Sequence, residues 1–120
     1  MDTIGFRKNI VILHSNMGQK EIIELIKETA ARVLPANSSL WLYGSRARGG
    51  ASPGSDYDLL ILVDSETITP QVESAAYELC LMGYDNNVEI NPHIYQKNKW
   101  KGWTFTPFYK NVERDKVVLM

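Results

Sequence analysis

Hydrophobic side chains recur along this chain with two different periods, and each period predicts one kind of element. Over residues 19–34, apolar positions repeat every three or four residues, which is typical of an amphipathic helix, and Pro35 ends it. A second stretch with this spacing starts at Pro70, behind Thr69 as the expected N-cap, and ends near Gly83. The pattern therefore predicts two helices that each bury one face.

Three short apolar runs have the length and composition of β-strands. Residues 40–43 are followed by the pair Gly44-Ser45, and residues 59–63 are hydrophobic throughout, as expected of a strand buried on both faces. Over residues 88–95, apolar and polar side chains alternate, which predicts a strand with one exposed face. The order of helices and strands indicates an α/β (α+β) domain, with a short mixed sheet and helices packed on one face.

The first sixteen residues do not fit this order. Residues 9–14, NIVILH, form a β-like run, so residues 1–16 are expected to be an N-terminal extension that can hold an extra strand. Their short apolar core, with Asp2 in front of it, makes a poor signal peptide. The domain itself is expected to cover residues 17–120, a length that fits one domain.

The C-terminal tail is rich in aromatic residues. A helical turn is expected over residues 98–103, a short helix over 107–114, and a last strand or extended end over 116–119. Most of these rings should fill the core, because aromatic side chains bury large areas. Trp103 and Phe105 follow neither helical nor strand periodicity, so they are candidates for an exposed interaction surface.

Composition narrows the class of protein. With 13 basic and 14 acidic residues the net charge is −1, which offers no general attraction for nucleic acid, so no extended nucleic-acid binding is expected. The single cysteine, Cys80, excludes an internal disulfide and fits a reducing cytoplasm. No apolar run reaches the ~18 residues of a membrane span. A cytoplasmic protein without membrane contact is therefore expected.

The turn after the first strand has the chemistry of an anion-binding site. Gly44 lets the backbone approach a ligand closely, and Ser45 adds a hydroxyl beside the free N–H groups that open a helix. Arg46 and Arg48 add two permanent cations, whose forked donors suit phosphate oxygens. These four residues predict a cradle for phosphate groups.

Two carboxylates open the next strand. Asp56 and Asp58 are two positions apart, so their side chains point the same way, with Cα atoms roughly 6.5 Å apart at ~3.3 Å rise per residue. Two such carboxylates repel each other unless protons or cations lie between them. Mg²⁺ is the usual partner where phosphate is also bound. The sequence thus predicts a metal-binding pair facing a phosphate cradle, as phosphoryl or nucleotidyl transfer requires.

Together these motifs carry a family resemblance. Residues 44–49, GSRARG, followed by residues 55–59, SDYDL, resemble the signature of the nucleotidyltransferase superfamily that includes the polymerase beta palm. The chain is most similar to minimal nucleotidyltransferases (MNT), which in bacteria often accompany a HEPN-domain protein as a toxin–antitoxin pair. The ending TPFYKNVERDKV is similar to that of members encoded beside HEPN proteins. Either motif alone is weak evidence, but the two together, each at a strand end, are specific.

The resemblance implies a single polymerase beta-like palm and a role for each motif residue. The carboxylate pair would hold Mg²⁺, as two ions or with Mn²⁺ in its place, and the glycine turn would hold the β- and γ-phosphates of ATP. The resemblance leaves two roles open for Arg48, which are stabilising the loop and binding pyrophosphate. The expected site residues are Gly44, Ser45, Arg46, Arg48, Asp56, Asp58 and Glu89.

Glu89 is included among the expected site residues because the superfamily usually places a third carboxylate on a neighbouring strand. It is the only carboxylate of the third predicted strand, where it would complete the metal site or take the proton from the attacking hydroxyl. The alternative is an exposed charge on an edge strand, with Asn91, Pro92 and His93 facing the site instead.

Three functions stay open at this stage. The leading one is the transfer of AMP from ATP to a hydroxyl of a protein partner, by the antitoxin of a HEPN/MNT pair whose partner is on a separate chain. The second is a non-catalytic antitoxin that masks a HEPN ribonuclease by binding. The third is a transferase that modifies an antibiotic, against which the lack of a second domain counts. The sequence does not determine the nucleotide, the acceptor or the oligomeric state, and it leaves a homo-oligomer open.

Overall fold

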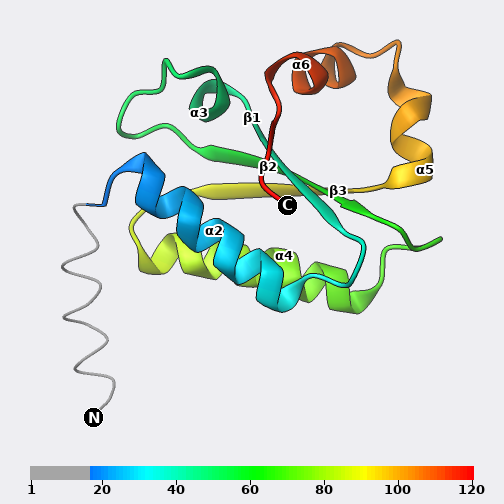
Figure 1. Cartoon of the computed structure of the whole chain (residues 1–120), viewed down its shortest axis with the longest axis horizontal. Helices are drawn as coiled ribbons and strands as arrows, with labels where there is room; N and C mark the ends of the chain where they lie inside the picture. Colours follow the sequence, from blue (N-terminus) through cyan, green and yellow to red (C-terminus); the bar gives the residue numbers. More distant parts are fainter. Residues whose placement is uncertain (1–16) are drawn as a thin grey trace.

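The computed structural model describes residues 17–120, and it confirms the predicted α/β class and the order of the elements (Figure 1). The expected extension, residues 1–16, and its β-like run over residues 9–14 lie outside the described residues. Within residues 17–120, every helix is too short or too polar to cross a bilayer. The elements are α2 (Gln19–Val33), β1 (Ser39–Tyr43), α3 (Ser45–Arg48), β2 (Tyr57–Val63), α4 (Pro70–Asp85), β3 (Ile90–Gln96), α5 (Lys97–Trp100), the 3₁₀ helix η1 (Lys101–Trp103), α6 (Pro107–Asp115) and β4 (Val117–Val118).

The four strands form one mixed sheet in the order β3-β2-β1-β4. β1 pairs antiparallel with β2 and with β4, whereas β2 and β3 run parallel. A parallel pair needs a long crossover connection, which α4 supplies. β2 lies inside the sheet and is buried along almost its whole length, as its unbroken hydrophobic run predicted.

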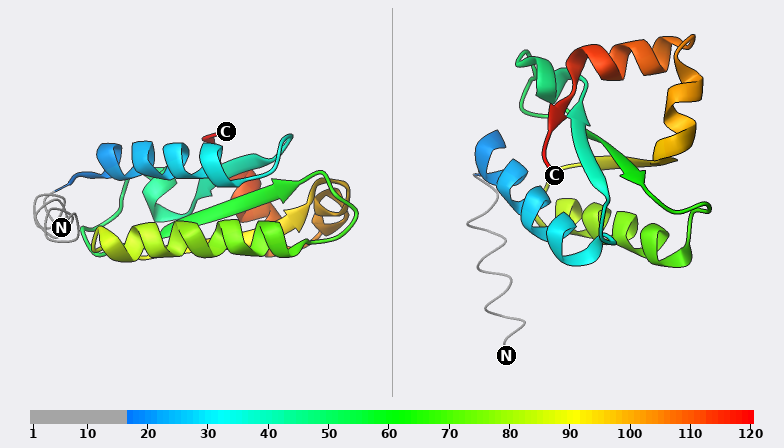
Figure 2. Two further views of the ribbon diagram at one scale, coloured as in Figure 1. Left: turned by 90° about the horizontal axis from the view of Figure 1, so that it is seen from below. Right: turned by 45° about the vertical axis from the view of Figure 1, so that its right-hand side comes forward.

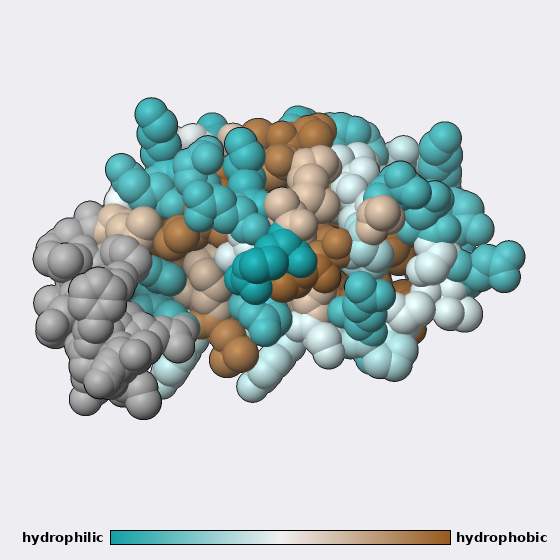
Figure 3. Space-filling view, turned by 60° about the horizontal axis from the view of Figure 1, so that its bottom comes forward, coloured by the Kyte–Doolittle hydropathy of each residue, from teal (hydrophilic) through white to brown (hydrophobic). Residues whose placement is uncertain are grey.

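α2 and α4 lie side by side on one face of the sheet (Figure 2). Thr69 caps α4 as predicted, since its hydroxyl accepts a hydrogen bond of 3.3 Å from the N–H of Val72. The outer surface of these helices is mostly hydrophilic, with scattered hydrophobic side chains (Figure 3). Their inner sides meet alternate residues of β2 in the main core, whose members include Ile22, Ile26, Ala30, Tyr57, Leu59, Ile61, Val72 and Leu79.

The opposite face of the sheet carries the C-terminal tail. The two main helices lie on one face as predicted, while α5 and α6 form a second, smaller layer on the other side (Figure 1). Trp100 and Val112 from this layer are buried against Leu60 and Leu62 of β2. The aromatic residues of the tail were expected in the core, but their irregular spacing did not show which face they cover.

One contact between α4 and β3 can be tested by adding a single methyl group. A Cβ at Gly83 would lie 2.8 Å from Cγ1 of the buried Ile90 and 3.0 Å from the carbonyl oxygen of Val88. Overpacking costs about 1–3 kcal/mol, more than the ~0.5–1 kcal/mol that alanine gains over glycine in a helix. Gly83→Ala should therefore lower the free energy of unfolding, measured by chemical denaturation, by up to about 2 kcal/mol.

Gly102→Ala is the matched control, because a Cβ at that position meets no atom within 4 Å. Its effect should stay within about 0.5 kcal/mol. Equal losses in the two variants would show that close packing at Gly83 does not set the cost.

Candidate active site

The predicted site residues meet at one end of the sheet, where β1 ends and where β2 and β3 begin. In register, Tyr43 of β1 lies opposite Asp58 of β2, which lies beside Asn91 of β3. Asp58 shares its face with Leu60, which packs in the same cluster as Tyr43 and the α5–α6 layer. The candidate site is therefore on the face opposite α2 and α4.

Gly44 lies against the carboxylate of Asp58. Its backbone has φ 77°, a conformation that favours glycine, and a Cβ there would be 2.6 Å from Oδ2 of Asp58. The next residue opens α3, and the N–H groups of Ala47 and Arg48 each donate to the carbonyl of Gly44 at 3.0 Å. Glycine at this position brings the turn and the second aspartate into contact.

Asp56 lies directly before β2, and its nearest polar partner is an amide. Nδ2 of Asn91 donates a hydrogen bond of 2.9 Å to Oδ2 of Asp56. Among the described residues, neither Asp56 nor Asp58 forms an ion pair. Both side chains are half-buried. The structure thus brings together two carboxylates and leaves their charge without a cation from residues 17–120.

Glu89 lies beside the start of β2, but it does not form a metal-binding group with this pair. It is exposed and precedes β3, and its carbonyl oxygen accepts a hydrogen bond of 2.9 Å from the N–H of Tyr57. Within residues 17–120, no three His, Cys, Asp or Glu side chains are grouped closely enough to hold a metal ion. Asn91, rather than Glu89, contacts the carboxylates in this structure, and the role of Glu89 as metal ligand or base stays a prediction.

Arg46 is buried, and its hydrogen bonds hold the loop between α3 and β2 in place. Its guanidinium donates to the carbonyl oxygens of Ser55 at 3.1 Å and Pro53 at 3.0 Å, and to Oε1 of Gln19 at 3.2 Å. It also stacks over the ring of Tyr57, at 4.4 Å from the ring centre. These contacts hold the Gly-Ser turn against α2 and β2. A contact between Arg46 and phosphate stays a prediction.

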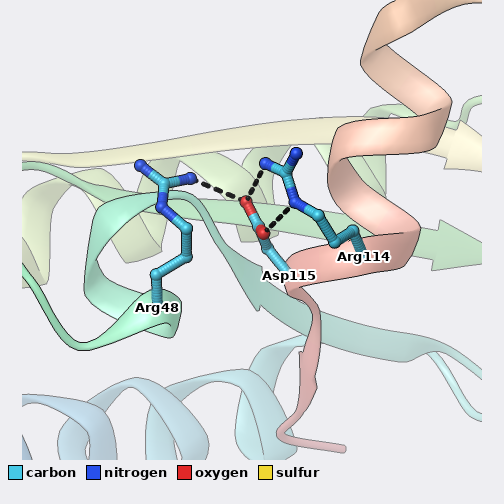
Figure 4. A network of polar contacts seen from close by, with 3 residues as sticks. All are labelled: Arg48, Arg114 and Asp115. Atoms are coloured by element: carbon cyan, nitrogen blue, oxygen red, sulfur yellow. Dashed lines mark hydrogen bonds and ion pairs between the residues drawn. The ribbon is translucent and has the colours of Figure 1, made fainter.

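Arg48 ties α3 to the end of α6 (Figure 4). Its Nη1 lies 2.7 Å from Oδ2 of Asp115, and Nε of Arg114 lies 2.8 Å from Oδ1 of the same carboxylate. The hydrogen bonds from Arg114 and then from Arg48 lower the pKa of Asp115 below its usual value. Of the two roles that the sequence left open for Arg48, the structure provides contacts for the stabilising one.

Tyr43 and His93 also lie at this site, and Tyr43 was missed by the sequence analysis. The ring centres of Tyr43 and His93 are 6.5 Å apart, and that of Phe108 is 5.7 Å from Tyr43. Burial, followed by the charge of Asp58, raises the pKa of Tyr43 to about 12. A neutral hydroxyl therefore lies beside the carboxylates. The available signal was its position, since Tyr43 is the last strand residue before Gly44.

The contact between Gly44 and Asp58 predicts a specific loss of stability. Gly44→Ala and Gly49→Ala both place alanine at a positive φ, of 77° and 91°, which costs roughly 1–2 kcal/mol. Only at Gly44 does the new Cβ also meet a side chain, because nothing lies within 4 Å at Gly49. Chemical denaturation should therefore show a larger loss for Gly44→Ala. In an Asp58→Ala background the excess should vanish; an excess that persists would rule out this contact as its cause.

Comparison with known proteins agrees with this geometry. The family described as "Nucleotidyltransferase domain" matches residues 20–118. A solved structure described as "Crystal structure of the toxin-antitoxin with AMP-PNP" has a similar fold, with a TM-score of 0.55 and 16% identity over 87% of this chain and 73% of that chain. Curated proteins gave no match. Because the match spans nearly all of residues 17–120 and includes both motifs, the chain belongs to the nucleotidyltransferase domain family.

Proposed function

We propose that this chain transfers AMP from ATP to a hydroxyl of a protein partner, and that it is the antitoxin of a HEPN/MNT pair. The observation that carries the proposal is the pair Asp56 and Asp58, of which Asp58 lies against the turn at Gly44, and neither has a cation partner among the described residues. Family membership supports nucleotidyl transfer. The similar fold of a toxin–antitoxin protein solved with AMP-PNP supports ATP as donor and a protein as partner.

The donor atoms at this pair fit a hard divalent cation. Asp56 and Asp58 offer carboxylate oxygens from neighbouring positions on one face, and the amide of Asn91 uses one of those oxygens while adding no positive charge. Mg²⁺, as one or two ions, prefers such ligands, and Mn²⁺ can replace it. Bound there, the metal would supply charge neutralisation for the triphosphate and polarisation of the α-phosphorus.

Residues of the chain itself have the remaining roles in the reaction. The oxygen of the acceptor hydroxyl attacks the α-phosphorus, the bond to the bridging oxygen of the β-phosphate breaks, and pyrophosphate leaves. Gly44 and Ser45 bind the β- and γ-phosphates, while Arg46 fixes the turn through the loop carbonyls. The acceptor's proton passes to Glu89, whose exposed carboxylate is open to a protein substrate.

A second function, masking of a HEPN ribonuclease without catalysis, is favoured by one observation. Asn91, which cannot take a proton, contacts Asp56, and no third carboxylate joins the pair among residues 17–120. A protein that has lost its base could keep the nucleotide-binding turn and still bind its partner. The two functions differ in whether the partner is modified.

Metal dependence of nucleotide binding tests the site itself. Because the two carboxylates repel each other and the triphosphate, ATP should bind measurably only with Mg²⁺ or Mn²⁺ present, in a calorimetric titration. Asp58→Asn should weaken that binding by about tenfold or more, while leaving the fold intact or more stable. Asp64→Asn, an exposed carboxylate just after β2, is the control and should bind ATP normally. Equal affinity with and without metal, in all three proteins, would rule out the metal site.

Transfer itself tests the role of Glu89. With labelled ATP, Mg²⁺ and the purified HEPN partner, the wild type should add the mass of one AMP to the acceptor. Glu89→Gln should lower this rate by about 10²–10⁴-fold and spare ATP binding, because the base is lost while the turn remains. Glu73→Gln, exposed on α4, should keep full activity. Full activity of Glu89→Gln would remove it from the reaction, and a tight complex with no transfer by the wild type would favour masking.

A further inference from the structure

An exposed histidine on β3 lies near the carboxylate pair and has no role in the reaction described so far. His93 is two residues after Asn91, which is beside Asp58 in the register of the two strands. Residues two apart in a strand share a face, so His93 is on the same face as Asp58, roughly 6.6 Å further along at ~3.3 Å per residue. Within residues 17–120, its side chain forms no hydrogen bond or ion pair. The imidazole is therefore open to a ligand.

The ring of His93 contacts two other aromatic rings. Its centre is 6.5 Å from that of Tyr43 and 6.1 Å from that of Phe108, and the centres of Tyr43 and Phe108 are 5.7 Å apart. Both supporting rings are held from below, because Tyr43 is buried at the end of β1 and Phe108 meets the buried Trp100 edge-on at 5.8 Å. We call Tyr43, His93 and Phe108 the ring platform.

Two other exposed rings do not join the ring platform. Trp103 and Phe105, which the sequence analysis named as candidates for an interaction surface, are 44% and 74% exposed. In the part of the chain that the structure describes, Trp103 contacts the ring of Tyr95, and Phe105 has no ring contact. His93 differs from both, because it contacts Tyr43 at the end of β1, next to the carboxylates.

We propose that the ring platform holds the nucleobase of the bound nucleotide, with His93 stacking on it. The inference rests on the proposed function, in which the turn at Gly44 binds the β- and γ-phosphates and the α-phosphate lies at the carboxylates. In the sheet order, Gly44 follows β1 on one side of Asp58, and His93 is on β3, on the other side. With the triphosphate running from the turn to the carboxylates, the nucleoside beyond the α-phosphate reaches β3, since neighbouring strands are about 4.8 Å apart. Exposed aromatic side chains stack on nucleobases, which all present a flat face.

The base of the nucleotide fits the ring platform better than the acceptor does. In the proposed reaction the acceptor hydroxyl gives its proton to Glu89, which is four residues before His93, roughly 13 Å along an extended chain at ~3.3 Å per residue. Asn91 lies between them and donates its hydrogen bond to Asp56. The acceptor hydroxyl therefore comes to the start of β3, and the platform further along the strand is left to the nucleoside.

Calorimetric titration of the full chain with two ligands, ATP and inorganic triphosphate, each with Mg²⁺, tests the inference. Triphosphate carries the phosphates without a base. His93→Ala should weaken the binding of ATP by about tenfold, the effect expected from losing one stacked base, and should leave the affinity for triphosphate unchanged. His93→Phe should keep the ATP affinity within about threefold of the wild type, because one ring replaces another.

The matched control is Tyr77→Ala, which removes a ring that is 64% exposed on α4, on the opposite face of the sheet. It should bind both ligands as the wild type does, and thermal melts should show all variants folded. Three results would overturn the inference alone: unchanged ATP binding in His93→Ala, an equal loss for ATP and triphosphate, or a loss in His93→Phe as large as in His93→Ala. A wild type that binds neither ligand with metal present would overturn the proposed function, and the inference with it.

Discussion

The contact between Gly44 and Asp58 fixes how the sheet presents its chemistry. Asp58 lies on β2, inside the sheet, so its backbone position is fixed by the pairing with β1 and β3. Because Gly44 has φ 77° and a Cβ there would come within 2.6 Å of that carboxylate, glycine is strongly favoured where β1 ends and α3 begins. The proposed phosphate-binding turn and the proposed metal-binding carboxylate are thus neighbours for a steric reason that precedes any ligand.

The arginines near the site bond to other groups, and neither forms an ion pair with Asp56 or Asp58. Arg46 donates hydrogen bonds to loop carbonyls and to Gln19, and Arg48 forms an ion pair with Asp115. If either guanidinium reached the aspartates, it would neutralise the charge that a divalent ion needs, and a cation held by two permanent partners would be hard to displace. The arginines of the motif therefore stabilise the turn and the loop, and they leave the acidic pair open for the divalent ion that we propose.

The sequence predicted those parts that depend on local pattern. α2 and α4 follow from their three-to-four spacing, β2 from its unbroken apolar run, and the carboxylate pair from the period of a strand. Contacts between distant residues left no such pattern. Arg46 donates its hydrogen bonds to backbone carbonyls, which every residue has, and to the side chain of Gln19, which is 27 positions away in the sequence.

The same limit applies to the third strand. Side chains at 89 and 91 differ by one full period of a strand, so the sequence allowed both to face the site. In the structure the amide of Asn91, rather than the carboxylate of Glu89, bonds Asp56, and Asn91 lies beside Asp58 in the register with β2. Alternation predicts a face, and the register with β2 decides which residue on that face comes nearest.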